Sequence, residues 1–163
     1  MKIAILSDVH DNIWKLASVL EDVRRIGAME LIFCGDLCSP FTLKQIAEGM
    51  AGPVHVVLGN NDGDPMLLSK VAAGLSNVRL HGLFAYLTLD GQKVAITHYP
   101  PLGRDQALAG QYALVCYGHD HQAHIERVGH TTLVNPGEVM GRLGRSTYAV
   151  YDTGTRAAEI REV

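Results

Sequence analysis

The sequence begins with MKIAILSDVHDN (residues 1–12), and this stretch decides the fold. Its apolar run, residues 3–6, stops abruptly at polar residues, which predicts a buried parallel strand that leads into a loop. In open α/β sheets, ligands bind beyond the carboxyl ends of the strands. Asp8 and His10 are two positions apart, so an extended chain would direct both side chains to one side. The stretch therefore predicts half of a metal site, to be completed by other strand ends.

The composition fits a globular protein. The chain has 163 residues, enough for one full domain but too few for two, so we expect a single domain over residues 1–163. Apolar residues make up 47%, which argues against disorder. The net charge is −3, and no run of Lys and Arg exceeds two residues, so bulk nucleic-acid binding is not expected.

The same features bear on location. The first apolar run is too short for the hydrophobic segment of a signal peptide, and no run approaches the roughly 18 apolar residues of a membrane span. The three cysteines are an odd number without paired spacing, which favours reduced thiols. We therefore expect a cytoplasmic protein without a membrane partner.

Three strand–helix units are predicted in the first half of the chain. Apolar residues recur at three- and four-residue steps after residue 12, and Ser39-Pro40 and Asp64-Pro65 have the cap-then-proline form of helix starts. Consecutive units of this kind imply right-handed crossovers and a parallel sheet. The expected elements are strands at 3–6, 31–34 and 53–58, and helices at 13–26, 40–50 and 65–73.

Hairpins dominate the second half. Asp90-Gly91 is a strong two-residue turn signal, and Gly129-His130 and Thr153-Gly154 separate further apolar runs. The expected elements are a hairpin of 84–89 and 92–97, a short helix at 104–109, a strand at 113–117, a hairpin of 124–128 and 131–135, and a closing hairpin of 146–151 and 156–161.

Metal-ligating residues follow five of these strands. Each alone has an ordinary explanation, since Asp and Asn cap helices and a single His is usually structural. Together they have no shared structural purpose, and their oxygen and nitrogen donors suit Mn²⁺, Fe or Zn²⁺. Two ions about 3.5–4 Å apart would need a bridging carboxylate. The seven candidate ligands are Asp8, His10, Asp36, Asn60, His98, His119 and His121.

The motifs that contain these residues resemble those of the calcineurin-like metallophosphoesterase superfamily, in particular its small bacterial and archaeal phosphodiesterase branch. They occur in the order of the family pattern and span residues 3 to about 140. They are Asp8-Val9-His10, Gly35-Asp36, Gly59-Asn60-Asn61-Asp62, His98, Gly118-His119-Asp120-His121 and Asn135-Pro136-Gly137.

The resemblance implies a four-layer α/β/β/α sandwich of two mixed sheets flanked by helices, with two divalent ions at the carboxyl edge of the strands. Mn²⁺ is the expected metal, with Fe, Zn²⁺ and Ni²⁺ as alternatives. Members of the branch often form homodimers or homotetramers. By position, Asp8, His10 and His121 would hold one ion, Asn60, His98 and His119 the other, and Asp36 would bridge them.

One position departs from the superfamily pattern. Asn61 stands where a His usually protonates the leaving group, and an amide can donate a hydrogen bond but cannot deliver a proton. Asn61 and Asp62 are the candidate catalytic residues at this motif. Asn12 and His124 are candidates for substrate contact, although an edge role in its strand is the alternative for His124.

We therefore expect a metal-dependent phosphodiesterase in which a metal-bridging hydroxide attacks phosphorus in line, acting on a small-molecule phosphodiester. A phosphomonoesterase or phosphoprotein phosphatase is one alternative, and Asn61 and the short chain speak against it. A non-catalytic scaffold with the same fold is the other, and the intact ligand set speaks against that.

Overall fold

The first strand lies near the middle of a six-stranded mixed sheet in the computed structural model, which describes residues 1–163. It pairs in parallel with β2 on one side and antiparallel with β10 on the other. From edge to edge, the strands are β11 (Ala157–Glu162), β10 (Thr147–Asp152), β1 (Lys2–Leu6), β2 (Glu30–Phe33), β3 (Val54–Val56) and β4 (Val78–Leu80).

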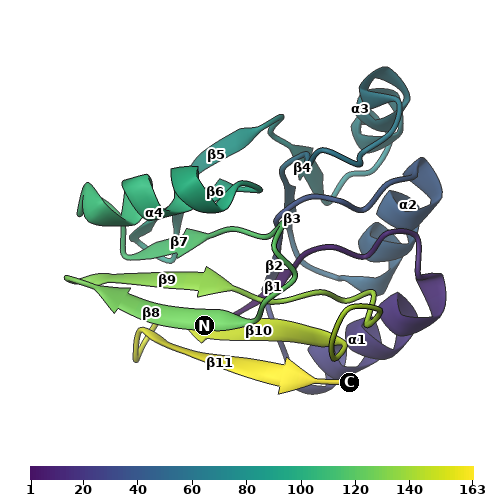
Figure 1. Ribbon diagram of the computed structural model, residues 1–163. Helices are drawn as coiled ribbons and strands as arrows, with labels where there is room; N and C mark the ends of the chain where they lie inside the picture. Colours follow the sequence, from purple (N-terminus) through teal and green to yellow (C-terminus); the bar gives the residue numbers. More distant parts are fainter.

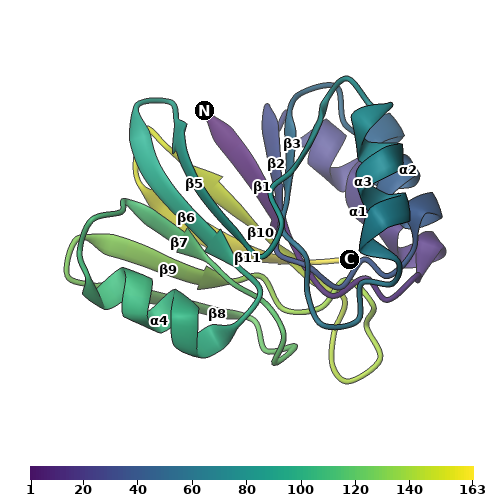
Figure 2. The same ribbon diagram turned by 90° about the horizontal axis from the view of Figure 1, so that it is seen from above.

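A second mixed sheet of five strands faces the first (Figures 1 and 2). Its centre is parallel, and an antiparallel hairpin lies at each edge. The strands, in order, are β5 (Phe84–Leu89), β6 (Gln92–Thr97), β7 (Leu114–Cys116), β9 (Thr131–Asn135) and β8 (His124–Val128). At the β5–β6 turn, Asp90 and Gly91 both have positive φ, of 47° and 73°, as a type I′ turn requires.

Helices cover the two outer faces, and Figure 2 shows the resulting four layers. Helices α1 (Ile13–Arg25), α2 (Pro40–Gly49) and α3 (Pro65–Ala73) pack on the six-stranded sheet, and α4 (Pro100–Leu108) packs on the other. Apolar side chains of both sheets, among them Ile5 and Ile96, form the layer between them. The expected sandwich of two mixed sheets flanked by helices is confirmed.

The helix starts follow the predicted signals. Asn12, Ser39 and Asp64 each cap a helix by accepting a hydrogen bond from a backbone N–H of the first turn, and Pro40 and Pro65 take the first helical position. These caps place the helix starts beside the loops that follow β1, β2 and β3. None of the helices is long and apolar enough to cross a membrane.

Two expectations about elements were wrong. Helix α4 begins at Pro100 instead of residue 104, because the prolines of Pro100-Pro101 occupy its first turn, where a missing N–H costs nothing. Strand β4 was not expected, because its three residues include the exposed Arg79 and show no apolar run. It pairs in parallel with β3 at the edge of the sheet.

Candidate metal centre

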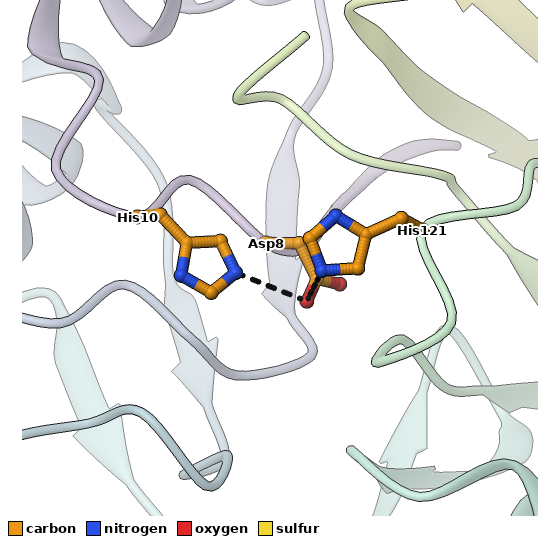
Figure 3. A group of neighbouring side chains, drawn as sticks. All are labelled: Asp8, His10 and His121. Carbon is orange, nitrogen blue, oxygen red and sulfur yellow. Dashed lines mark ion pairs between the residues drawn. The ribbon is translucent and has the colours of Figure 1, made fainter. Parts of the chain in front are cut away.

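All seven candidate ligands lie in the loops at the carboxyl ends of β1, β2, β3, β6 and β7. One group is Asp8, His10 and His121, shown in Figure 3. The carboxylate oxygen Asp8 Oδ1 lies 3.6 Å from His10 Nε2 and 3.4 Å from His121 Nε2. Asp8 is fully buried, and neither Asp8 Oδ1 nor His10 Nε2 has a hydrogen-bond partner. Buried polar atoms of this kind are costly unless something pairs with them.

The Asp36 carboxylate lies between this group and the remaining histidines. Its Oδ2 atom is 3.6 Å from His10 Nε2 and 3.4 Å from His98 Nε2. Asp36 and His98 are buried, and with Asp8 they form a second group of ligand atoms that all lie within 4.8 Å of one another. One oxygen is therefore near the histidine nitrogens of both groups, the position that a bridging ligand needs.

The last two candidates complete the far side of the centre. The amide oxygen Asn60 Oδ1 lies 3.1 Å from His98 Nε2 and 2.9 Å from His119 Nδ1. The two imidazole nitrogens are 3.3 Å apart. Asn60 and His119 are exposed, so this side of the centre is open to solvent. The structure thus brings all seven predicted ligands together in two adjoining groups.

The backbone of these loops is strained. Asp8, His10, Asp36, His119 and His121 all have φ between 44° and 79°, the left-handed region that non-glycine residues rarely adopt. Such conformations cluster at functional sites, where the surrounding structure holds them in place. The expectation of an extended Asp8–His10 segment was therefore wrong. The two side chains converge because both residues turn through left-handed backbone.

Two glycines allow the loops to approach one another closely. A Cβ on Gly118 would lie 2.0 Å from Ser7 Oγ, and one on Gly59 would lie 2.2 Å from Asp36 Oδ1. Both distances are far below contact, so any larger residue would push the loops apart. The glycines of the Gly-His and Gly-Asn motifs are thus packing requirements of the site.

Hydrogen bonds between the carboxylates and their neighbours outweigh burial in the electrostatics of the centre. Burial alone would raise the pKa of Asp36, but hydrogen bonds from His98 and Asn61 outweigh it and hold that pKa well below its usual range. Burial lowers the pKa of His98, but its pairing with Asp36 outweighs burial and raises that pKa. The Asp8 carboxylate raises the pKa of His10. The centre thus favours positive charge beside its carboxylates, which bound cations would supply.

Three of the histidines have a neighbouring polar group on Nδ1, the ring nitrogen that points away from the centre. His98 Nδ1 donates to the backbone carbonyl of Cys34 at 2.7 Å, and His121 Nδ1 donates to Glu138 Oε2 at 2.8 Å. His10 Nδ1 lies 3.7 Å from the Cys38 thiol. In each case the other nitrogen, Nε2, faces the centre. Metal-ligating histidines characteristically have such outer partners, which fix the ring and its tautomer.

The residues present fit divalent ions. The donors are carboxylate and amide oxygens and imidazole nitrogens, the set that suits Mn²⁺, Fe and Zn²⁺. The unpartnered atoms Asp8 Oδ1 and His10 Nε2 point into the group, so a cation there would satisfy both. No thiolate faces the ligand nitrogens, since the Cys38 sulfur approaches His10 on its outer nitrogen.

The two candidate catalytic residues support the ligands. Asn61 donates to Asp36 twice, from its backbone N–H to Oδ1 at 2.8 Å and from its side chain to Oδ2 at 2.7 Å. Asp62 accepts from the backbone N–H groups of Asp36, Gly59 and Cys38 at 3.0, 2.7 and 2.8 Å. Asp62 thereby ties the loop after β2 to the loop after β3.

The two candidates for substrate contact lie differently. The side-chain oxygen of Asn12 caps α1, and its amide nitrogen donates to the Met140 carbonyl at 2.9 Å. Both polar atoms of the side chain are therefore engaged in hydrogen bonds within the fold. His124 is exposed on β8 and lies 3.5 Å from Glu126 Oε2, in a pocket that α4 and β8 line together. The structure does not bring His124 to the seven ligands.

Sequence reasoning missed Glu138, a fully buried carboxylate just after Asn135-Pro136-Gly137. It carries no periodic or spacing signal, because its partner His121 is 17 residues away and reaches it only in the folded chain. The one hint in the sequence is a glutamate in the turn that follows a buried apolar strand ending at Asn135, where a buried charge is unexpected.

Comparison with known proteins places the site in a family. A model of the calcineurin-like phosphoesterase superfamily domain matches residues 1–156. The chain belongs to this superfamily. It is 31% identical over 170 residues to phosphodiesterase MJ0936 of Methanocaldococcus jannaschii, with 100% of this chain and 98% of that relative covered. Phosphodiesterase YfcE of Escherichia coli is 27% identical over 152 residues, covering 85% of this chain and 79% of the relative.

The solved structures agree. The structure of an archaeal phosphodiesterase matches this member of the calcineurin-like phosphoesterase superfamily with a TM-score of 0.92 and 28% identity, covering 100% of both chains. The superfamily is metal-dependent, which accords with the convergence of seven metal-ligating side chains. The predicted family and the predicted phosphoesterase class are thereby confirmed.

Proposed function

We propose that this protein is a phosphodiesterase that depends on two divalent ions, with Mn²⁺ as the expected metal. Asp8, His10 and His121 would hold one ion, Asn60, His98 and His119 the other, and Asp36 both. The observation that carries the proposal is the position of Asp36 Oδ2, within 3.6 Å of His10 Nε2 and 3.4 Å of His98 Nε2. Two divalent ions, when bound, supply Lewis-acid stabilisation of the phosphoryl group and lower the pKa of water for in-line attack.

The chain's own residues prepare that chemistry. The buried carboxylates Asp8 and Asp36 provide the negative charge that holds cations, and Asn61 keeps Asp36 in place with two hydrogen bonds. The carbonyl of Cys34 holds the proton of His98 on Nδ1, so Nε2 is left as a ligand. Asn61 cannot protonate a leaving group. Substrates with good leaving groups, or diesters whose leaving oxygen takes a proton from water, are therefore favoured.

Two relatives of this chain are phosphodiesterases, and this supports a diester substrate. We propose a small-molecule phosphodiester as substrate for this chain, which acts as one domain over residues 1–163. A cytoplasmic location and a homodimer or homotetramer complete the proposal.

Metal analysis and an assay of two substrates test the proposal. Protein purified without chelator should contain close to two divalent ions per chain, and with Mn²⁺ it should hydrolyse bis(nitrophenyl) phosphate faster than nitrophenyl phosphate. Removal of the ions should abolish both activities, and Mn²⁺ should restore them.

A preference for the monoester would favour a phosphomonoesterase. Negligible metal content that Mn²⁺ does not restore would favour a scaffold. A panel of cyclic nucleotides, dinucleotides and phospholipid head-group diesters would then identify the substrate class.

A further inference from the structure

Glu138 is a buried carboxylate that is not itself one of the seven proposed ligands. It follows β9 and has no exposed surface, yet no Lys or Arg pairs with it. A buried carboxylate without a countercharge is strongly disfavoured unless hydrogen bonds compensate for lost hydration. The location of those hydrogen bonds therefore indicates what this residue does.

The two carboxylate oxygens have separate partners. Oε1 accepts the backbone N–H groups of Leu143 and Gly144 at 2.7 and 2.6 Å, in the exposed loop before β10. Oε2 lies 2.8 Å from His121 Nδ1, while Nε2 of the same ring lies 3.4 Å from Asp8 Oδ1. The carboxylate thus connects a loop at the rim of the centre to one of the candidate ligands.

We infer that Glu138 is a positioning residue that keeps the proton of His121 on Nδ1 and thereby presents Nε2 as a metal ligand. A carboxylate only accepts hydrogen bonds, so the nitrogen that faces it must carry a proton. The opposite nitrogen of a neutral imidazole then has its lone pair free, directed toward Asp8. The loop amides hold the carboxylate in this orientation. The inference rests on the metal centre proposed above.

The substitution Glu138→Gln isolates this role. Leu143 and Gly144 both donate to Oε1, so they select the orientation in which the new amide oxygen meets them. The amide nitrogen must then face His121 Nδ1, and it can only donate. His121 would have to accept at Nδ1 and carry its proton on Nε2, the nitrogen needed for the metal. The variant therefore preserves shape and loop contacts while reversing the preferred tautomer.

The experiment is a calorimetric titration of the metal-free protein with Mn²⁺. The wild type should bind two ions, and in Glu138→Gln one of the two affinities should fall about 10–100-fold, the usual effect of losing an outer partner of a ligating histidine. Glu48→Gln is the matched control, because Glu48 on α2 is exposed and its side chain makes no hydrogen bond or ion pair. This control should bind both ions like the wild type.

Two outcomes overturn the inference and can be told apart. A wild type that binds no ions removes the proposed function and this inference with it. A wild type that binds two ions, together with an equally tight Glu138→Gln, removes only the role of Glu138. If Glu138→Gln does not fold, nitrogen-15 NMR of the metal-free wild type decides the question, because there no metal ion sets the tautomer. The His121 proton is expected on Nδ1, and a proton on Nε2 would overturn the inference.

Discussion

The two sides of the candidate centre differ in how far their polar atoms are already satisfied. On the side of Asp8, the carboxylate oxygen Oδ1 and the His10 nitrogen Nε2 face each other without a hydrogen-bond partner. On the other side, Asn60 Oδ1 already lies within hydrogen-bonding distance of both His98 and His119. The first side carries a buried carboxylate of its own, whereas the second contributes only neutral donors.

Because of this difference, we expect the two sides of the centre to bind cations with unequal affinities. A cation on the Asp8 side gains a buried negative charge and pairs atoms that otherwise lack partners. A cation on the Asn60 side must replace contacts that already exist, in a place open to solvent. We expect the Asp8 side to hold its ion more tightly and the Asn60 side to exchange its ion more readily.

The largest effect is expected where the two sides meet. Asp36→Asn removes the one charge placed near both histidine groups, so it should weaken both ions and increase their mutual repulsion. Its loss of activity should reach at least about 10³-fold, the upper range for removing a single electrostatic stabiliser. Steady-state rates with saturating Mn²⁺ measure it. His98→Ala should lose less, and equal losses in the two variants would show that Asp36 serves one ion only.

A smaller effect is expected from restoring a proton donor at position 61. Asn61→His places an imidazole beside the centre, and a general acid contributes about 10²-fold at the low end of its usual range. Substrates with alkyl leaving groups should benefit and nitrophenyl substrates should not, because only the former need a proton. The ratio of the two rates is the quantity to measure, since it is insensitive to any general loss from the broken bond to Asp36.

Asn61→Ala is the control for this ratio. It removes the same hydrogen bond to Asp36 Oδ2 without adding an acid, so the alkyl-to-nitrophenyl ratio should stay that of the wild type. A wild type that already cleaves alkyl diesters as fast as nitrophenyl diesters would show that the missing acid is not limiting.

The next effect concerns one side of the centre alone. Asn60→Ala removes a neutral ligand from the side expected to be weaker, so the weaker of the two Mn²⁺ affinities should fall by at least about tenfold, the smallest loss usual when even an outer partner of a ligand is removed. The tighter affinity should not change. Titration calorimetry of the metal-free protein resolves the two sites. If the tighter affinity falls instead, the assignment of the two sides is reversed.

Much of this arrangement could be predicted because strand ends carry a local signal. An apolar run that stops at Asp, Asn or His marks both the strand and the ligand, and parallel strands bring such ends to one edge. The left-handed backbone of Asp8 and His10 could not be predicted in this way, because tertiary contacts impose it. Glu138 was missed for the same reason.

The contacts of Asn61 and Asp62 could not be predicted from the motif that contains them. Asn61 and Asp62 were expected to act in catalysis, and the structure shows their hydrogen bonds to Asp36 and to neighbouring loop amides. Such bonds depend on how two separate loops meet, which spacing within one motif does not describe. Their catalytic role therefore stays a prediction.

The smallest effect on the metal centre is expected from a substitution in a buried hydrogen-bond network that contains none of the candidate ligands. Asp22 on α1 is only 7% exposed and accepts hydrogen bonds from Tyr148 of β10, Arg161 of β11 and Arg25. It ties the helix layer to the edge of the six-stranded sheet. None of these partners is a candidate ligand, so Asp22→Asn should leave both Mn²⁺ affinities unchanged while lowering stability.

The pH dependence of that stability follows from charge. The hydrogen bond from Tyr148, together with those of Arg25 and Arg161, lowers the pKa of Asp22 below its ordinary value. A carboxylate with a lowered pKa stabilises the fold fully above its unfolded pKa of about 3.9, and this contribution is lost as pH falls below that value. At pH 7, Asp22→Asn should therefore cost about 1–3 kcal/mol of unfolding free energy, as expected when a buried hydrogen-bonding group is left poorly paired.

The difference in unfolding free energy between wild type and variant should shrink below about pH 4. Urea unfolding at pH 7, 5 and 3.5 measures it, with the exposed neighbour Glu21→Gln as control. A difference that stays constant down to pH 3.5 would show that the Asp22 charge does not stabilise the fold.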